Sequence, residues 1–232
     1  MRRLYLGLIT SLLAVPMTSI TALGGSQPWT VYDYNSSGRV LAPRVSADSM
    51  PATTSGATTA FQLIPGTFTA LLLTRDRSLT GDLSGRTLVA TVTWSGTAGF
   101  VEQNGGGCVP DHQFVRFKIE APSAAGSTPT GTTLPPSGFF TQFWWSNPIH
   151  VDLVGNSGSG VITAPLSWPA AAGMWSDWDG KSNTGSPELT EAFIEATMKV
   201  QSVGLSFGGG CFFENGLTTA ARGTFTSTFG EV

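Results

Sequence analysis

Thr87-Leu88-Val89-Ala90-Thr91-Val92-Thr93-Trp94 is the stretch that decides the fold of this chain of 232 residues. Apolar side chains stand at every second position, at Leu88, Ala90, Val92 and Trp94, and threonine fills three of the positions around them. Successive side chains of a β-strand point to opposite faces. The alternation therefore predicts an antiparallel strand with one buried face and one wet face.

Strands of the same kind recur along the chain. Val115, Phe117 and Ile119 alternate with Arg116 and Lys118, so we expect the three apolar residues to be buried and the two cations to face solvent. Further strands are expected at 57–64, 67–73, 98–103, 139–146, 149–154, 161–166, 202–207, 211–214 and 224–229.

One short helix is expected among these strands, at about residues 187–199. Ser186 is a favoured N-cap residue, and Pro187 occupies the first helical position, where proline is well tolerated. Apolar side chains at 189, 193 and 196 then share one face of the helix. A single helix in a strand-rich chain leaves the fold class all-β, with two antiparallel sheets packed as a sandwich.

The first residues of the chain are typical of an export signal. A basic pair precedes an apolar run at 4–15, and Ala22-Leu23-Gly24 is a cleavage site of the small-x-small type. We therefore expect a signal peptide at residues 1–24 and a single β-sandwich domain at 25–232. The apolar run is short for a membrane span, and an uncleaved anchor is the alternative.

No second long apolar run follows the leader. We therefore expect no transmembrane segment after signal removal, and a protein that is secreted or held at the cell surface. The segment 121–137 is rich in Pro, Gly, Ser and Thr. We interpret it as a long surface loop, and a domain linker is the alternative.

The chain is poor in charge and mildly acidic. Its formal net charge is −3 at pH 7, and removal of a leader that holds two arginines and no acid makes it −5. This balance argues against nucleic acid and anionic membranes as partners. Hydrophobic residues make up 41% of the chain, which is enough to build a core and excludes general disorder.

The two cysteines stand in the same sequence context. Cys108 follows Gly105-Gly106-Gly107, and Cys211 follows Gly208-Gly209-Gly210. An even number of cysteines in an exported chain favours a disulfide between Cys108 and Cys211. Two separately buried thiols are the alternative.

Two strings of sequence resemble a known group of proteins. Residues 73–83 (Leu-Thr-Arg-Asp-Arg-Ser-Leu-Thr-Gly-Asp-Leu) and 206–216 (Ser-Phe-Gly-Gly-Gly-Cys-Phe-Phe-Glu-Asn-Gly) are similar to stretches of secreted bacterial proteins of unassigned function, over roughly residues 60–232. The tryptophan-rich loop, the helix and the Val-Gly-Leu-Ser-Phe strand also resemble the end of jelly-roll carbohydrate-binding modules of the galactose-binding-like superfamily. The resemblance implies a jelly-roll sandwich and, by analogy of fold, sugar binding.

No catalytic or metal-binding motif stands out. A Gly-x-Ser-x-Gly elbow is absent, His112 and His150 have no identifiable nucleophile partner, and no residues have the spacing of zinc ligands. Scattered carboxylates leave a divergent polysaccharide-active enzyme as one hypothesis. Asp177 and Asp179 offer oxygen ligands for a structural calcium ion, but turn-forming aspartates explain the same pattern, so no cofactor is expected.

Tryptophans provide the best functional lead. Sugar rings present apolar C–H faces on which flat indole rings stack. The neighbours Trp144 and Trp145 point to opposite faces if they lie on a strand, so one of them is expected outside the core. The competing interpretation is that the rings fill the end of the sandwich. The candidate ligand-binding residues are Trp144, Trp145, Asn147, Trp175, Asp177, Trp178 and Asp179.

These observations favour an exported, non-catalytic protein that binds an extracellular polysaccharide or glycan through exposed tryptophans. A structural or adhesive surface protein without a small ligand is the main alternative. A sheet lined by aromatic rings would favour sugar binding, whereas a flat polar surface with buried tryptophans would favour the structural role.

Overall fold

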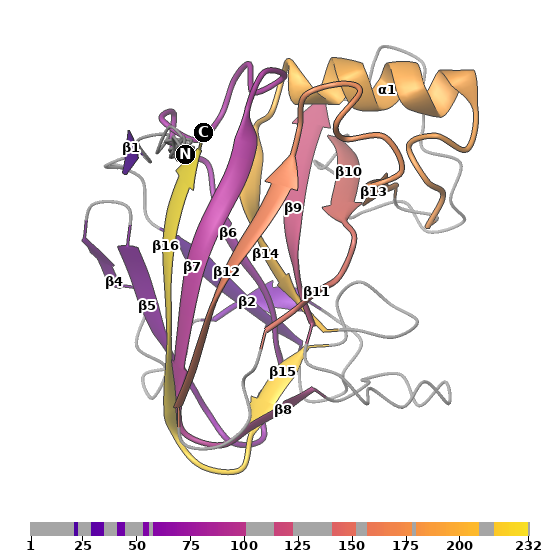
Figure 1. Ribbon diagram of the computed structural model, residues 1–232. Coiled ribbons are helices and arrows are strands. Elements are labelled where there is room, and N and C mark those ends of the chain that lie inside the picture. Colours follow the sequence, from indigo (N-terminus) through magenta and orange to yellow (C-terminus); the bar gives the residue numbers. More distant parts are fainter. Residues whose placement is uncertain are drawn as a thin grey trace, which may run out of the picture.

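The computed structural model describes residues 21–22, 29–34, 41–44, 53–55, 58–100, 114–122, 141–151, 157–177, 180–208 and 216–231. These residues form two sheets, and every strand pairing in them is antiparallel (Figure 1). One helix lies across one end of the sandwich. The predicted all-β sandwich is therefore confirmed, while the finer jelly-roll topology stays a prediction.

The smaller sheet has the strand order β12-β7-β16-β5-β4, with β1 paired to β16. The strand that predicted the fold class is β7, which lies between the edge strand β12 and β16. Its apolar positions are buried and Thr91 and Thr93 are exposed, as the alternation predicts. The strands are β1 Thr21–Ala22, β4 Thr53–Ser55, β5 Thr58–Leu63, β7 Thr87–Ser95, β12 Ser157–Pro165 and β16 Gly223–Glu231.

The larger sheet has the order β13-β10-β9-β14-β6-β15-β8, with β11 beside β9 and the pair β2–β3 beside β6. Its strands are β2 Thr30–Tyr34, β3 Leu41–Pro43, β6 Thr69–Thr74, β8 Ala98–Phe100, β9 Phe114–Pro122, β10 Thr141–Ser146, β11 Ile149–His150, β13 Trp175–Ser176, β14 Ser202–Phe207 and β15 Leu217–Thr219.

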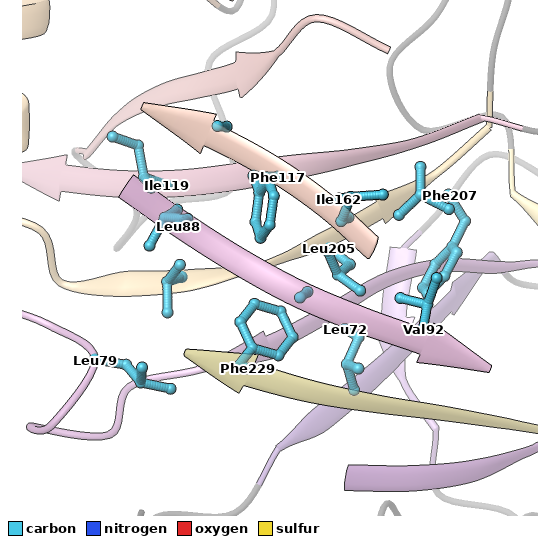
Figure 2. Packing of buried hydrophobic residues seen from close by; sticks show 14 of the residues in the cluster. Leu72, Leu79, Leu88, Val92, Phe117, Ile119, Ile162, Leu205, Phe207 and Phe229 are labelled. Carbon is cyan, nitrogen blue, oxygen red and sulfur yellow. The ribbon is translucent and has the colours of Figure 1, made fainter. Parts of the chain in front are cut away.

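The core lies between the two sheets. Figure 2 shows Phe117 and Leu205 of the larger sheet in the same buried cluster as Val92 and Phe229 of the smaller sheet. The rings of Phe117 and Phe229 meet edge to face, with centroids 6.0 Å apart. Such aromatic pairs add to the free energy gained from burying apolar area, so they help to hold the sheets together.

Strand β9 departs from the expected pattern on one of its faces. Val115, Phe117 and Ile119 are fully buried, as predicted. Arg116 and Lys118 are only 6% and 3% exposed, so the prediction that they face solvent is wrong. The strand lies between β10 and β14, and aromatic rings on β10 pack over the Lys118 ammonium.

Helix α1 spans Pro187–Thr197, two residues shorter than predicted. The hydroxyl of Ser186 accepts a hydrogen bond from the Leu189 backbone N–H at 3.3 Å, which confirms the N-cap. Phe193 is fully buried and packs against tryptophan rings from β10 and β13. The helix therefore closes the end of the sandwich that is uppermost in Figure 1.

The string at residues 73–83 forms turns around a buried leucine. The Asp76 carboxylate accepts hydrogen bonds from the backbone N–H and hydroxyl of Ser78, and Leu79 is buried as an apolar anchor. Gly81 and Val200 exchange backbone hydrogen bonds at 2.7 and 2.9 Å. This string is therefore an architectural feature that joins β6 to the chain beyond α1.

Several predictions fall outside the described residues. They concern Cys108 and Cys211, the strand at 211–214 and nearly all of the loop at 121–137. Of the expected signal peptide, only Thr21–Ala22 is described, where it pairs with Gly230 and Glu231. Within the described part of the chain, no helix is both long and apolar enough to span a membrane.

Candidate functional site

The burial of the tryptophans decides which of them can contact a ligand. Of the six that the structure describes, five are at most 5% exposed and Trp168 is 40% exposed. The buried five are Trp29, Trp94, Trp144, Trp145 and Trp175. Trp178 and Asp179 lie outside the described residues.

Trp144 and Trp175 fill the end of the sandwich. Both rings contact Phe193 of α1, with centroids 5.2 and 5.8 Å apart. The Trp144 indole N–H donates to the side chain of Gln142 at 3.1 Å, and the Trp175 indole N–H donates to the Pro165 carbonyl at 2.8 Å. Both rings therefore serve the core, as the competing interpretation anticipated.

Trp145 lies outside the main core, as strand alternation predicts, but it is not exposed. Its ring stacks with Phe143, two residues earlier on β10, with centroids 6.0 Å apart. The Lys118 ammonium lies 4.7 Å from the centre of the Phe143 ring and 4.9 Å from that of Trp145, and 3.3 Å from the Glu120 carboxylate. These four residues form the charged-aromatic cluster on the outer face of the larger sheet.

Arg116 continues the row of charges on this face of β9. Its guanidinium donates to the Ser146 carbonyl at 3.2 Å. Burial lowers the pKa of Arg116 to about 10, which still leaves the side chain charged at neutral pH. The charged-aromatic cluster and Arg116 are thus buried within the protein, and no ring face in the cluster is open to solvent.

The polar candidates next to the tryptophans build turns. The Asp177 carboxylate accepts the Lys181 backbone N–H at 2.7 Å, and the Asp177 carbonyl accepts the Gly180 N–H at 3.0 Å. This geometry is that of a turn-forming aspartate. Among the described residues, no group of three or more His, Cys, Asp or Glu side chains is placed to hold a metal ion.

Trp168 stands on a loop that follows β12 and is held in one shape by hydrogen bonds. Residues 167–174 form three backbone hydrogen bonds of 2.9–3.0 Å among themselves. The fully buried Asn183 donates to the Ala171 carbonyl at 2.9 Å and accepts the Gly173 N–H at 2.8 Å. Asn147, which is exposed, donates to the Gly173 carbonyl at 3.1 Å. Asn147 and Asn183 therefore both hold the loop in its shape.

The Trp168 loop is uncharged and carries one exposed indole ring. Residues 167–174 read Ser-Trp-Pro-Ala-Ala-Ala-Gly-Met and carry no charge. An exposed indole offers an apolar ring face and one N–H donor. His150, the one histidine among the described residues, packs edge-on against Phe114.

Sequence reasoning passed over Trp168 in favour of tryptophans that are paired in the sequence. The missed signal was positional, because Trp168 stands three residues after the end of β12 and directly precedes a proline. Such a place is a turn, where a large side chain has fewer neighbours to bury it.

Comparisons with known proteins found no match for this chain, neither among family models, nor among curated proteins, nor among solved structures.

Proposed function

We propose that this chain is an exported, non-catalytic β-sandwich protein that binds carbohydrate through Trp168. The observation that carries the proposal is the exposure of that indole, at 40%, on a loop held by Asn147 and Asn183. Trp144, Trp145 and Trp175 were expected to share in this contact, and their burial gives them a supporting role instead.

A ring on a pre-organised loop is suited to weak sugar binding. An indole stacks on the C–H face of a pyranose, and a loop already in its binding shape loses little conformational entropy on association. The resemblance to galactose-binding-like modules supports the same function, although a fold by itself does not determine what a protein binds.

The test is binding of residues 25–232 to soluble and insoluble polysaccharides, followed by intrinsic fluorescence and pull-down. Trp168→Ala should abolish binding and leave the melting temperature unchanged, because the side chain is partly in solvent. Met198→Ala is the matched control, since Met198 is a large apolar residue at 48% exposure in another part of the chain. Binding that survives Trp168→Ala would overturn the proposed site.

The structural or adhesive alternative rests on a different observation. The outer face of the smaller sheet is polar and uncharged along its two central strands, with exposed Thr91 and Thr93 on β7 and half-buried threonines at 224, 226 and 228 on β16. Five buried tryptophans fit this alternative as well. A wild-type chain that binds no glycan but coats a cell surface would favour it.

A further inference from the structure

Strand β12 forms one edge of the smaller sheet. All nine of its residues pair with β7 in an unbroken register, from Ser157 opposite Ser95 to Pro165 opposite Thr87. Within the described residues, no strand pairs with its other side, and Figure 1 shows β12 as the last strand of the sheet on that side. Among the described residues, β12 therefore ends the sheet with no strand partner on its outer side from Ser157 to Ala164, while the Pro165 carbonyl at its end accepts the Trp175 indole N–H at 2.8 Å.

The other sheet ends in the described residues are short. The smaller sheet ends in β4, of three residues. The larger sheet ends in β8 and β3, of three residues each, and in β13 and β11, of two residues each. Short edge strands are one of the ways in which proteins prevent unwanted strand pairing. Among the described end strands, β12 is therefore the long one, and it is the edge on which another strand can pair.

Other protective devices are also missing from β12. Its sequence, Ser-Gly-Ser-Gly-Val-Ile-Thr-Ala-Pro, holds no charged residue, its proline is at the last position, and no bulge interrupts its register. Val161, at the centre, is 63% exposed. Lysine, proline within the strand and bulges are what normally protect an exposed edge.

We propose that β12 pairs with β12 of a second copy of this chain, antiparallel and across a twofold axis at Val161. The seven residues 158–164, centred on 161, are self-complementary in this register, and the pairing stops before Pro165, whose carbonyl is bonded to the Trp175 indole. Ser159 lies opposite Thr163 of the partner subunit, and Gly160 lies opposite Ile162 of the partner subunit, so a small residue meets a large one on the core-facing side. The pairing joins the two smaller sheets into one continuous sheet.

The charge of β12 and the area that a pair of β12 strands buries both bear on pairing with a second copy of the chain. The strand carries no charge, so no like charges face each other along the paired strands. One strand pair buries less than the roughly 800 Å² per partner of a standard stable interface. The dimer is therefore reversible and depends on concentration.

The first test is the oligomeric state of the full chain, measured by sedimentation velocity over a wide concentration range. The wild-type chain should shift from monomer to dimer as concentration rises. Val161→Lys places two like charges at the twofold axis and should weaken dimerisation roughly 100-fold. Thr91→Lys is the matched control, because Thr91 is exposed on the same face, opposite Val161 but one strand further in.

The second test identifies the interface directly. Antiparallel neighbours have Cα atoms about 4.5–5.5 Å apart, within the range that a disulfide bridges. Val161→Cys should therefore give a covalent dimer on non-reducing gels, and Thr91→Cys should not. A chain that stays monomeric, a dimer unaffected by Val161→Lys, or a dimer that Val161→Cys fails to cross-link would each overturn the proposal.

Discussion

Position 204 shows how closely two strands of the larger sheet approach each other. A Cβ added at Gly204 on β14 would lie 1.9 Å from the Leu72 carbonyl oxygen and 2.7 Å from the Leu73 side chain, both on β6. Backbone cannot yield as a flexible side chain does, so Gly204→Ala should destabilise the protein by about 3 kcal/mol or more in a urea melt.

Gly85→Ala is the control for this prediction. Nothing lies within 4 Å of a Cβ at Gly85, and its φ is not in the left-handed region. That substitution should leave stability unchanged or raise it by about 0.4–1 kcal/mol, because it restricts the unfolded chain. A Gly204→Ala variant as stable as Gly85→Ala would show that β14 and β6 are further apart than described.

The ion pair between Lys118 and Glu120 gives a second prediction at the same scale. Both side chains are only 4% exposed, so removing one of them leaves the charge of the other buried without its ion-pair partner. Glu120→Ala should therefore cost about 3–5 kcal/mol of unfolding free energy. The double variant Lys118→Met with Glu120→Leu should lose much less, since it removes both charges and keeps apolar volume.

The measurement is urea unfolding of the wild type and both variants, with equal m-values as the check that the transition stays two-state. A double variant less stable than Glu120→Ala would contradict the account, because it would mean that the charges themselves hold this face together.

At the scale of elements, the Ser186 hydroxyl caps the N-terminus of α1. Ser186 caps the Leu189 N–H, and Ser186→Ala should cost about 1 kcal/mol. The exposed Glu191→Ala is the control and should be close to neutral. Chemical denaturation near neutral pH compares the two.

This cap also makes a prediction about pH. Two hydrogen bonds hold the pKa of Glu188 below its ordinary value of 4.5. The larger effect comes from the Ser186 side chain, and the smaller one comes from the backbone of Glu188 itself. A depressed carboxylate pKa contributes stability that is fully present above 4.5 and is lost as the pH falls through the folded value. The difference in free energy of unfolding between the wild type and Ser186→Ala should therefore become smaller as the pH falls. A difference that becomes larger would contradict the hydrogen bond between Ser186 and Glu188.

Sequence periodicity predicted the elements well because it reports which side chains share a face. It placed β7, β14 and α1 to within two residues of their observed ends. It failed for the outer face of β9, because alternation does not reveal whether a polar face is covered. There, the covering rings come from Phe143 and Trp145, and the pairing of Trp145 with Lys118 depends on a register that no local pattern encodes.

The sequence predicted that tryptophans would form the candidate site, but it did not predict which tryptophan is exposed. Adjacent tryptophans on a strand were expected to separate between the two faces, and they do, but burial of the outer ring depends on tertiary packing. Exposure of Trp168 depends in turn on Asn183, a residue 15 positions further along that clamps the loop.

At the scale of the whole molecule, strand pairing bears on the two cysteines. Cys108 lies between Phe100 at the end of β8 and Phe114 at the start of β9. Cys211 lies between the end of β14 and the start of β15. The register places Phe100 opposite Leu217, and Val115 opposite Phe207. The two cysteine segments therefore leave and re-enter the same sheet at neighbouring strand ends.

The disulfide between Cys108 and Cys211, which lie outside the described residues, stays a prediction that this strand order permits. Cys108 is six residues before Phe114 and Cys211 is four residues after Phe207, spans that an extended chain of roughly 3.3 Å per residue covers. A bridge that closes about 100 residues stabilises by on the order of 4 kcal/mol in the chain-entropy model. Reduction should therefore lower the melting temperature of the wild type and leave that of the Cys108→Ala/Cys211→Ala variant unchanged. Thiol labelling of the denatured, unreduced chain is the direct check, and two reactive thiols would show that the cysteines are not bonded.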